Sequence, residues 1–307
     1  MVQDKRGQGV SAEESYTRAI EADGHDAYAY FSRAQFRLKL NKPDLALNDL
    51  ARADELGYHP ARVHFLRAHV YEAQGDAKSA RSERLAGLTI EPEDGDGWVQ
   101  RGIALARLGE PKSAVAAFDR ALTFDPADRT ALWNKAAVLA GSPHHLEDAV
   151  RVLDTVVRLN PNDLEALASR GVLLARLGRR GPAHDDARAV LSRDPNPPLV
   201  YQTAGVFALT SRLVDDDRRE AFALLKRAFD RGAGLTDVDR DSDLDPLRGD
   251  PEFARLVSGA RARVSGAARA PIPSPPPAST QTPVPSVTER HDLTPAGAPP
   301  SAGSHRP

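Results

Sequence analysis

A small residue, alanine or glycine, returns every 34 or 35 positions along most of this 307-residue chain. Two further series of mostly small residues follow nearly the same period. Three phased series indicate one supersecondary unit copied six times, so the chain folds as an array of stacked units rather than as a globule. The series are Ala34, Ala68, Gly102, Ala136, Gly171 and Gly205; Ala46, Ala80, Ala114, Ala149, Ala183 and Ala221; and Ala53, Gly87, Ala121, Val156, Val190 and Ala228.

The unit at 95–128 shows why each copy is a pair of helices. Its apolar residues recur at spacings of three or four, which predicts two amphipathic helices. Gly109 and Pro111 separate them, and Asp125 before Pro126 ends the second. Two short helices joined by a tight turn lie antiparallel. The two stripes are Trp98, Gly102, Leu105 and Leu108, followed by Ala114, Phe118, Ala121 and Leu122.

The phased small residues mark the places where helices cross. Side chains at a crossing set the distance between helix axes, and Gly or Ala permits the shortest distances. Glycine in the middle of a helix costs about 0.5–1 kcal/mol relative to alanine, so Gly102 and Gly171 need a packing reason. Close approach of the helices supplies that reason.

The phased pattern resembles the tetratricopeptide repeat (TPR) family. The copies that carry the resemblance read Trp98, Gly102, Leu105, Gly109, Ala114, Phe118, Ala121, Pro126; His64, Ala68, Tyr71, Gly75, Ala80, Gly87, Pro92; and Leu167, Gly171, Leu174, Gly178, Ala183, Val190, Pro195. The resemblance implies an all-α fold, a right-handed superhelical α-solenoid of antiparallel helix pairs. It also implies that the first helix of each pair lines a concave groove.

The period divides the chain into segments. We expect a disordered N-terminus at 1–10, a half-repeat with only a second helix at 11–26, a C-terminal cap at 234–264 and a Pro-rich disordered tail at 265–307. The half-repeat reflects either a truncated chain or an N-terminal cap. The tail is a ligand, a phosphorylated switch or a passive linker. The six TPR units are 27–60, 61–94, 95–128, 129–163, 164–197 and 198–233.

The composition excludes several classes of function. The chain has 41 basic and 43 acidic residues, no cysteine, and no apolar segment long enough to span a membrane. We therefore expect no nucleic-acid partner and no membrane partner. We expect the protein to be cytoplasmic. The histidines at 144–145 lack further ligands, and the alternating aspartates from Asp237 lack the glycine of a calcium loop. We therefore expect no metal, no cofactor and no catalytic residues.

The groove predicted by the resemblance gives a set of candidate partner-binding residues. They occupy the positions of each first helix that point into the concave face of a TPR array. Exposed aromatic residues beside arginine are typical of binding hot spots. Trp133 is the strongest candidate because its neighbour Leu132 fills the core position. The candidates are Tyr28, Phe31, Gln35, Lys39, Arg62, Phe65, His69, Gln100, Arg107, Trp133, Asn134 and Arg176.

These observations predict a non-enzymatic scaffold or adaptor that binds a peptide or partner protein in the groove. Two alternatives remain open. The segment at 243–253 resembles the closing segment of certain bacterial TPR proteins, some of them fused to Ser/Thr kinases, which implies a regulatory or recruitment module of a kinase pathway. A self-associating structural array is the other alternative, with Leu256 and Val257 at its interface.

Overall fold

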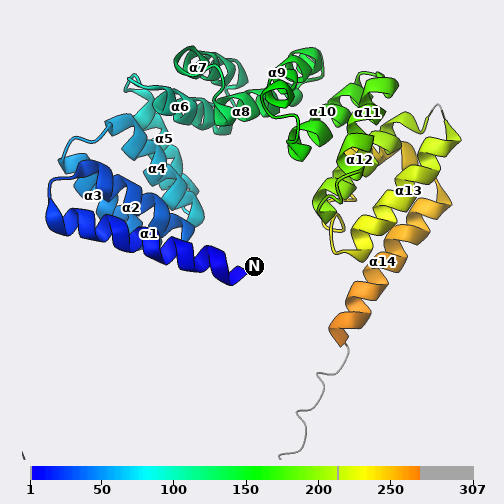
Figure 1. Cartoon of the computed structure of the whole chain (residues 1–307), viewed down its shortest axis with the longest axis horizontal. Helices are drawn as coiled ribbons and strands as arrows, with labels where there is room; N and C mark the ends of the chain where they lie inside the picture. Colours follow the sequence, from blue (N-terminus) through cyan, green and yellow to red (C-terminus); the bar gives the residue numbers. More distant parts are fainter. Residues whose placement is uncertain (1, 213, 270–307) are drawn as a thin grey trace, which may run out of the picture. The chain divides into compact units, whose positions relative to one another are not determined.

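The computed structural model describes residues 2–212 and 214–269, and this part of the chain is built from helices without strands. The predicted tail beyond residue 269 lies outside the described residues. Six consecutive helix pairs follow a first single helix and precede a capping segment (Figure 1). The single helix is α1 (Val2–Ala22), and the pairs are α2 (Ala27–Lys39) with α3 (Pro43–Glu55), α4 (Pro60–Ala73) with α5 (Ala77–Leu88), α6 (Gly95–Arg107) with α7 (Pro111–Phe124), α8 (Arg129–Ala140) with α9 (Leu146–Leu159), α10 (Leu164–Arg176) with α11 (Arg180–Leu191), and α12 (Pro197–Thr210) with α13 (Asp215–Asp230).

The helix pairs confirm the predicted α-solenoid. Each first helix packs on its own second helix, and each second helix packs on the first helix of the next pair. All eighteen phased positions of the three series are buried. At Gly102 an added Cβ would lie 2.5 Å from the ring of Phe118, so only glycine permits this crossing. At Gly87 an added Cβ would lie 2.7 Å from the ring of Phe65.

Turn chemistry sets the helix boundaries. A phased Asx side chain accepts a hydrogen bond from a backbone N–H in the first turn and so caps five of the six first helices. Between the two helices of a pair, Gly75, Gly109 and Gly178 take positive φ values of 79°, 83° and 72°. The fourth pair departs from this pattern, because a short 3₁₀ turn, η1 (Pro143–His145), joins its helices. The capping residues are Asp26, Asp94, Asp128, Asp163 and Asn196.

A basic residue at the middle of five first helices recurs with the same period. Four of these residues form an ion pair with a carboxylate of a neighbouring second helix. Arg101 instead donates through Nη1 to the carbonyl oxygens of Leu88 (3.0 Å) and Ile90 (3.1 Å). The pairs are Arg33–Asp49 at 2.7 Å, Arg67–Asp54 at 2.9 Å, Lys135–Asp119 at 2.5 Å, and Arg170 with Asp154 at 2.8 Å and Asp186 at 2.7 Å.

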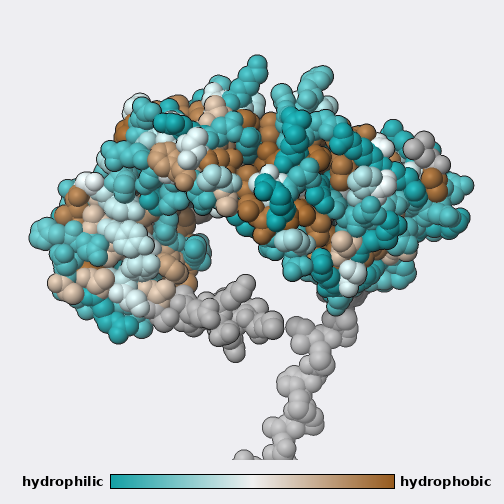
Figure 2. Space-filling view, turned by 45° about the horizontal axis from the view of Figure 1, so that its top comes forward, coloured by the Kyte–Doolittle hydropathy of each residue, from teal (hydrophilic) through white to brown (hydrophobic). Residues whose placement is uncertain are grey.

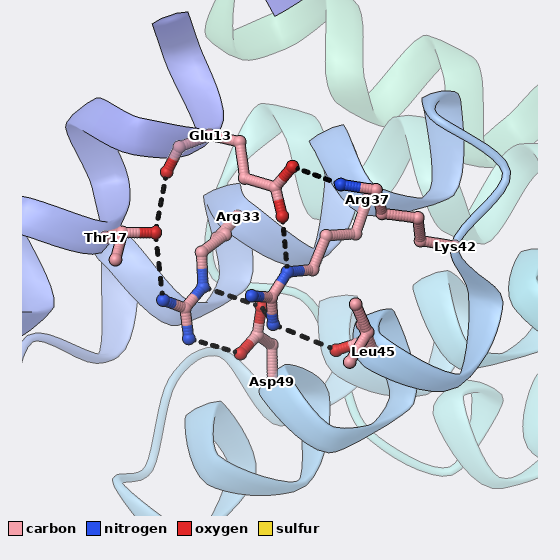
Figure 3. A network of polar contacts seen from close by, with 7 residues as sticks. All are labelled: Glu13, Thr17, Arg33, Arg37, Lys42, Leu45 and Asp49. Carbon is pink, nitrogen blue, oxygen red and sulfur yellow. Dashed lines mark hydrogen bonds and ion pairs between the residues drawn. The ribbon is translucent and has the colours of Figure 1, made fainter. Parts of the chain in front are cut away.

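The first helix joins the array through a polar network (Figure 3). Glu13 of α1 accepts hydrogen bonds from Arg37 Nε at 3.0 Å and from Lys42 Nζ at 2.7 Å. The contact with Lys42 lowers the pKa of Glu13. Arg37 also reaches Asp49 of α3 at 2.8 Å, so the network links three helices. Residues 2–10, which we expected to be disordered, form the first part of α1.

The capping segment comprises η2 (Ser242–Leu247) and α14 (Pro251–Arg269). Leu244 and Leu247 are fully buried, and η2 packs on α12. Pro251 opens the last helix, and α14 continues past the expected end of the cap at residue 264. Val257 is buried in the core and Leu256 is half-buried against it, so the apolar edge that self-association would use is covered. The relation of this segment to a kinase pathway stays a prediction.

Candidate interaction surfaces

The first helices of the N-terminal units present only some of the predicted groove residues. Tyr28, Gln35 and Lys39 are exposed. Phe31 and Phe65 are only 3% and 1% exposed, so they belong to the core and offer no surface to a partner. The ring of Phe65 lies against Gly87 of α5, and the ring centroid of Phe31 is 4.6 Å from that of Tyr58.

Arg62 lies in an aromatic cluster that the sequence did not reveal. Its guanidinium carbon is 5.2 Å from the ring centroid of Phe31 and 5.7 Å from that of Tyr58. Nη1 lies 3.4 Å from Asp94 and Nη2 lies 3.3 Å from Asp96. Since Asp94 caps α6 and Asp96 lies in the first turn of that helix, Arg62 serves the packing between its own helix pair and the next.

The middle of this face contains a half-buried histidine. Burial lowers the pKa of His69, and the nearby positive charge of Arg107 lowers it further. Arg107 donates to Glu72 at 2.8 Å, and Arg84 contacts the same carboxylate. Gln100 is half-exposed on the following unit. This part of the face is therefore polar, with its charges largely matched within the chain.

A pocket of about 230 Å³ opens between α8, α10 and α12. Among successive first helices, α8 and α10 make the weakest contact. The walls are mostly apolar, with small residues on α8. Hydrophobic side chains also gather on the surface at the middle of the array (Figure 2). The pocket is lined by Trp133, Ala136, Ala137, Ala140, Leu153, Ser169, Val172, Leu173, Arg176, Gln202 and Asp243.

Trp133, the strongest candidate from the sequence, lies at the wall of this pocket. Leu132 is buried in the core, whereas Trp133 is half-buried at the pocket wall. Arg129 lies over its ring, 5.2 Å from the centroid. The indole Nε1 is buried and has no hydrogen-bond acceptor within the described residues. Asn134, the neighbouring candidate, donates back to the carbonyl of Thr130 at 2.8 Å.

The polar end of the pocket is formed by residues from three elements. Arg176 of α10 holds Asp243 of η2 in a bidentate ion pair. We expected Arg176 to be a partner-binding residue of the groove, but its guanidinium pairs with a carboxylate of the capping segment. Gln202 of α12 donates to Ser169 of α10 at 3.2 Å. The pocket thus combines apolar walls with side-chain amide, hydroxyl and charged groups at one end.

The described residues show no cluster of three His, Cys, Asp or Glu side chains arranged for a metal. The aspartates near the cap contact other groups of the chain. Asp239 pairs with Arg261, and Asp250 accepts a hydrogen bond from the backbone N–H of Glu252. His145 lies 3.3 Å from Asp148. Within residues 2–212 and 214–269, no helix combines the length and the hydropathy that crossing a bilayer requires.

Comparison with known proteins identifies the repeat. Sequence models of the tetratricopeptide repeat match residues 95–139 and 134–200. The human protein O-mannosyl-transferase TMTC3 is 26% identical over 174 residues, which are 55% of this chain and 19% of that protein. The FK506-binding protein-like protein of Mus musculus is 31% identical over 123 residues, 38% of this chain and 35% of that protein. The chain spans less than half the length of the curated relatives it matches.

A solved structure shares the fold. The PilF protein of Pseudomonas aeruginosa superposes with a TM-score of 0.57 at 16% identity, covering 74% of this chain and 99% of that chain. The matched repeats, the buried small residues and the stacked helix pairs lead to one conclusion. The chain contains tetratricopeptide repeats at residues 95–200, and its helix pairs stack as an α-solenoid.

Proposed function

We propose that this TPR protein is a non-enzymatic adaptor that binds a peptide or partner protein along its first helices. The observation that carries the proposal is the pocket between α8, α10 and α12, with the buried and unpartnered indole N–H of Trp133 at its wall. A buried donor without an acceptor costs about 1–3 kcal/mol, and an acceptor from a partner removes that cost. TPR arrays are protein-interaction scaffolds, which supports the same reading.

The size of the pocket defines what it accepts. Pockets for small molecules have volumes of about 300–1,000 Å³, and this one is smaller, at about 230 Å³. It suits one large apolar side chain of a partner, packed against Ala136, Val172 and Leu173, rather than a cofactor. A carbonyl of the same partner accepts from Trp133 Nε1. Because the walls are helices already packed in the core, binding orders little of this chain.

The test is capture of interacting proteins by the full chain and by two pocket variants. Trp133→Ala removes the aromatic wall, and Ala137→Phe fills the pocket from an exposed position on α8. We expect a partner of the unmodified chain to be lost from both variants. Phe124→Ala is the matched control, because Phe124 is an exposed aromatic residue of α7 that does not line the pocket. Partners retained by both pocket variants would contradict the proposal.

A further inference from the structure

A second groove, of about 760 Å³, lies between α5 and α7 and has α6 as its floor. Its floor residues are Trp98, Arg101 and Leu105, and Leu88 and Ala116 are among its wall residues. Among the second helices α3 to α11, α5 makes the loosest contact with the first helix that follows it. Trp98 and Leu105 of α6 are half-buried, whereas Leu132 and Leu139 at the equivalent positions of α8 are buried.

The equivalent groove one unit later is smaller, at about 490 Å³, and its charges are matched within the chain. Its floor residues Leu132, Lys135 and Leu139 occupy the repeat positions of Trp98, Arg101 and Leu105. Lys135 pairs with Asp119 at 2.5 Å on one wall. On the other wall, Asp148 pairs with Arg151. In this groove over α8, the charged side chains are therefore paired with one another.

The groove between α5 and α7 lacks the matching carboxylate. Asp119 precedes Lys135 by 16 positions, and Asp154 precedes its partner Arg170 by 16 positions. Leu85 stands at the same distance before Arg101, and its side chain is 48% exposed. An apolar residue at the surface therefore replaces the carboxylate that Lys135 and Arg170 have at this position. Arg101 is the member of the phased basic series left without an ion pair in the described part of the chain.

Two guanidinium groups face the aromatic floor. The guanidinium carbon of Arg101 is 5.7 Å from the ring of Trp98, and that of Arg120 is 5.9 Å from it. Among the described residues, no carboxylate lies within ion-pair distance of Arg120. Glu91 is the single acidic residue among those that line the groove. The groove thus offers net positive charge beside exposed aromatic and aliphatic surface.

We propose that this groove binds an acidic amphipathic segment of a partner protein. Its carboxylates pair with Arg101 and Arg120, and its apolar side chains pack on Trp98, Leu88 and Leu105. Aliphatic walls favour a protein segment over a single-stranded nucleic acid, which binds through stacking platforms along a strongly basic channel. The groove is formed by α5, α6 and α7, so the proposal does not depend on the pocket lined by Trp133.

The probe is a synthetic amphipathic peptide with leucines at helical spacing and flanking glutamates, labelled for fluorescence anisotropy. A matched peptide carries glutamine in place of every glutamate. We expect the full chain to bind the acidic peptide at least about tenfold more tightly than the glutamine peptide, because charge-assisted hydrogen bonds are the stronger ones. In a Trp133→Phe background, the emission of Trp98, then the remaining tryptophan, shifts on binding.

Leu85→Asp is the decisive variant. It places a carboxylate at the repeat position of Asp119, where it neutralises Arg101 from within the chain, and we expect it to weaken binding of the acidic peptide at least about tenfold. Arg120→Glu, at an exposed position, has the same effect by charge reversal. The matched control is Leu159→Asp, since Leu159 is equally exposed (50%) at the end of α9. That control binds like the unmodified chain.

Four results overturn the proposal. They are absence of peptide binding by the unmodified chain, equal binding of the two peptides, unchanged binding in Leu85→Asp, and loss of binding in Trp133→Ala but not in Leu85→Asp. Binding of an oligouridylate that Leu85→Asp abolishes, without binding of the acidic peptide, would assign the groove to nucleic acid instead.

Discussion

Arg176 and Asp243 join the fifth helix pair to the capping segment across 67 residues of sequence. Nε donates to Oδ1 at 2.8 Å and Nη2 donates to Oδ2 at 2.9 Å. The carboxylate is largely buried, and it closes one end of the pocket that contains Trp133. The cap therefore both covers the last repeat and shapes the proposed binding site.

Asp243→Asn tests the contribution of this ion pair. We expect a loss of about 1–2 kcal/mol in the free energy of unfolding, because one partner of a charge-assisted bidentate pair becomes neutral. Hydrogen exchange should accelerate in η2 and at the start of α14. The control is Asp245→Asn, whose carboxylate makes an exposed contact with Arg248 three residues away. An equal loss in the free energy of unfolding in the two variants would mean that the bidentate pair contributes no more to stability than the exposed contact does.

Gly102→Ala tests the crossing of α6 and α7. Alanine is the better helix former, yet its Cβ would lie 2.5 Å from the ring of Phe118, which is fully buried. We expect a net destabilisation of about 1–3 kcal/mol from overpacking, measured by urea unfolding. Gly181→Ala is the matched control, since nothing lies within 4 Å of its added Cβ. That change should be neutral or mildly stabilising, and destabilisation of both variants alike would exclude the packing explanation.

The phased basic residues predict a difference between two substitutions of the same kind. Arg170 pairs with Asp186, which is buried, and with Asp154. Arg170→Met leaves that buried carboxylate without its partner, so we expect a loss of about 2–4 kcal/mol in thermal or urea unfolding.

Arg101→Met loses hydrogen bonds to two backbone carbonyls and no ion pair, so the expected loss is smaller, about 1–2 kcal/mol. A larger loss for Arg101→Met than for Arg170→Met would refute the electrostatic account of the series.

His184 predicts a fall in stability at acid pH. It is buried beside Phe207, and its Nε2 lies 3.0 Å from Thr210 Oγ1 and 3.5 Å from Asp217. Burial lowers the pKa of His184, an effect that Asp217 opposes and that Arg180 and Arg188 reinforce. The unfolded chain therefore binds the proton first as the pH falls. Stability is full above the ordinary histidine pKa of about 6.5 and is lost as the pH falls below it toward the folded pKa.

The measurement is the urea midpoint between about pH 8 and about pH 5, across the ordinary histidine pKa. His69, whose pKa is lowered in the same direction, contributes with the same sign. In His184→Gln the midpoint should depend less on pH than in the unmodified chain. An identical pH dependence would show that the proton uptake occurs elsewhere.

The helix pairs could be predicted from the sequence because the repeat period carries the same information several times over. The helix crossing requires a small residue at the position of Gly102 in every copy, so each copy indicates the same phase. The basic series at Arg33, Arg67, Arg101, Lys135 and Arg170 has this same period and went unnoticed because only apolar and small residues were compared. Applying the period to charged residues would have revealed it.

The candidate surface was harder to predict, because a one-residue shift around a helix exchanges core and surface. Phe31 and Phe65, which we predicted in the groove, lie in the core for this reason, whereas Trp133 is half-buried at the wall of a pocket. Arg176 shows a different limit. Its partner Asp243 lies outside the repeat period, in the capping segment, and no local pattern relates the two residues. The length of α1 was missed because residues 2–10 carry no phased apolar stripe.

The loose junction between α5 and α6 has a consequence for how the molecule comes apart. In a stacked array each unit is stabilised only by its neighbours, so cooperativity passes from unit to unit. Here the apolar cluster around Leu50 and Val63 is separate from the one around Phe118. A small cluster of Ala61, Phe65 and Ala104 crosses the junction, and Arg101 contributes no ion pair to it. Heating should therefore produce a state in which the units after α6 stay folded while those before it have melted, or the reverse, so the protein has two melting blocks within one continuous stack.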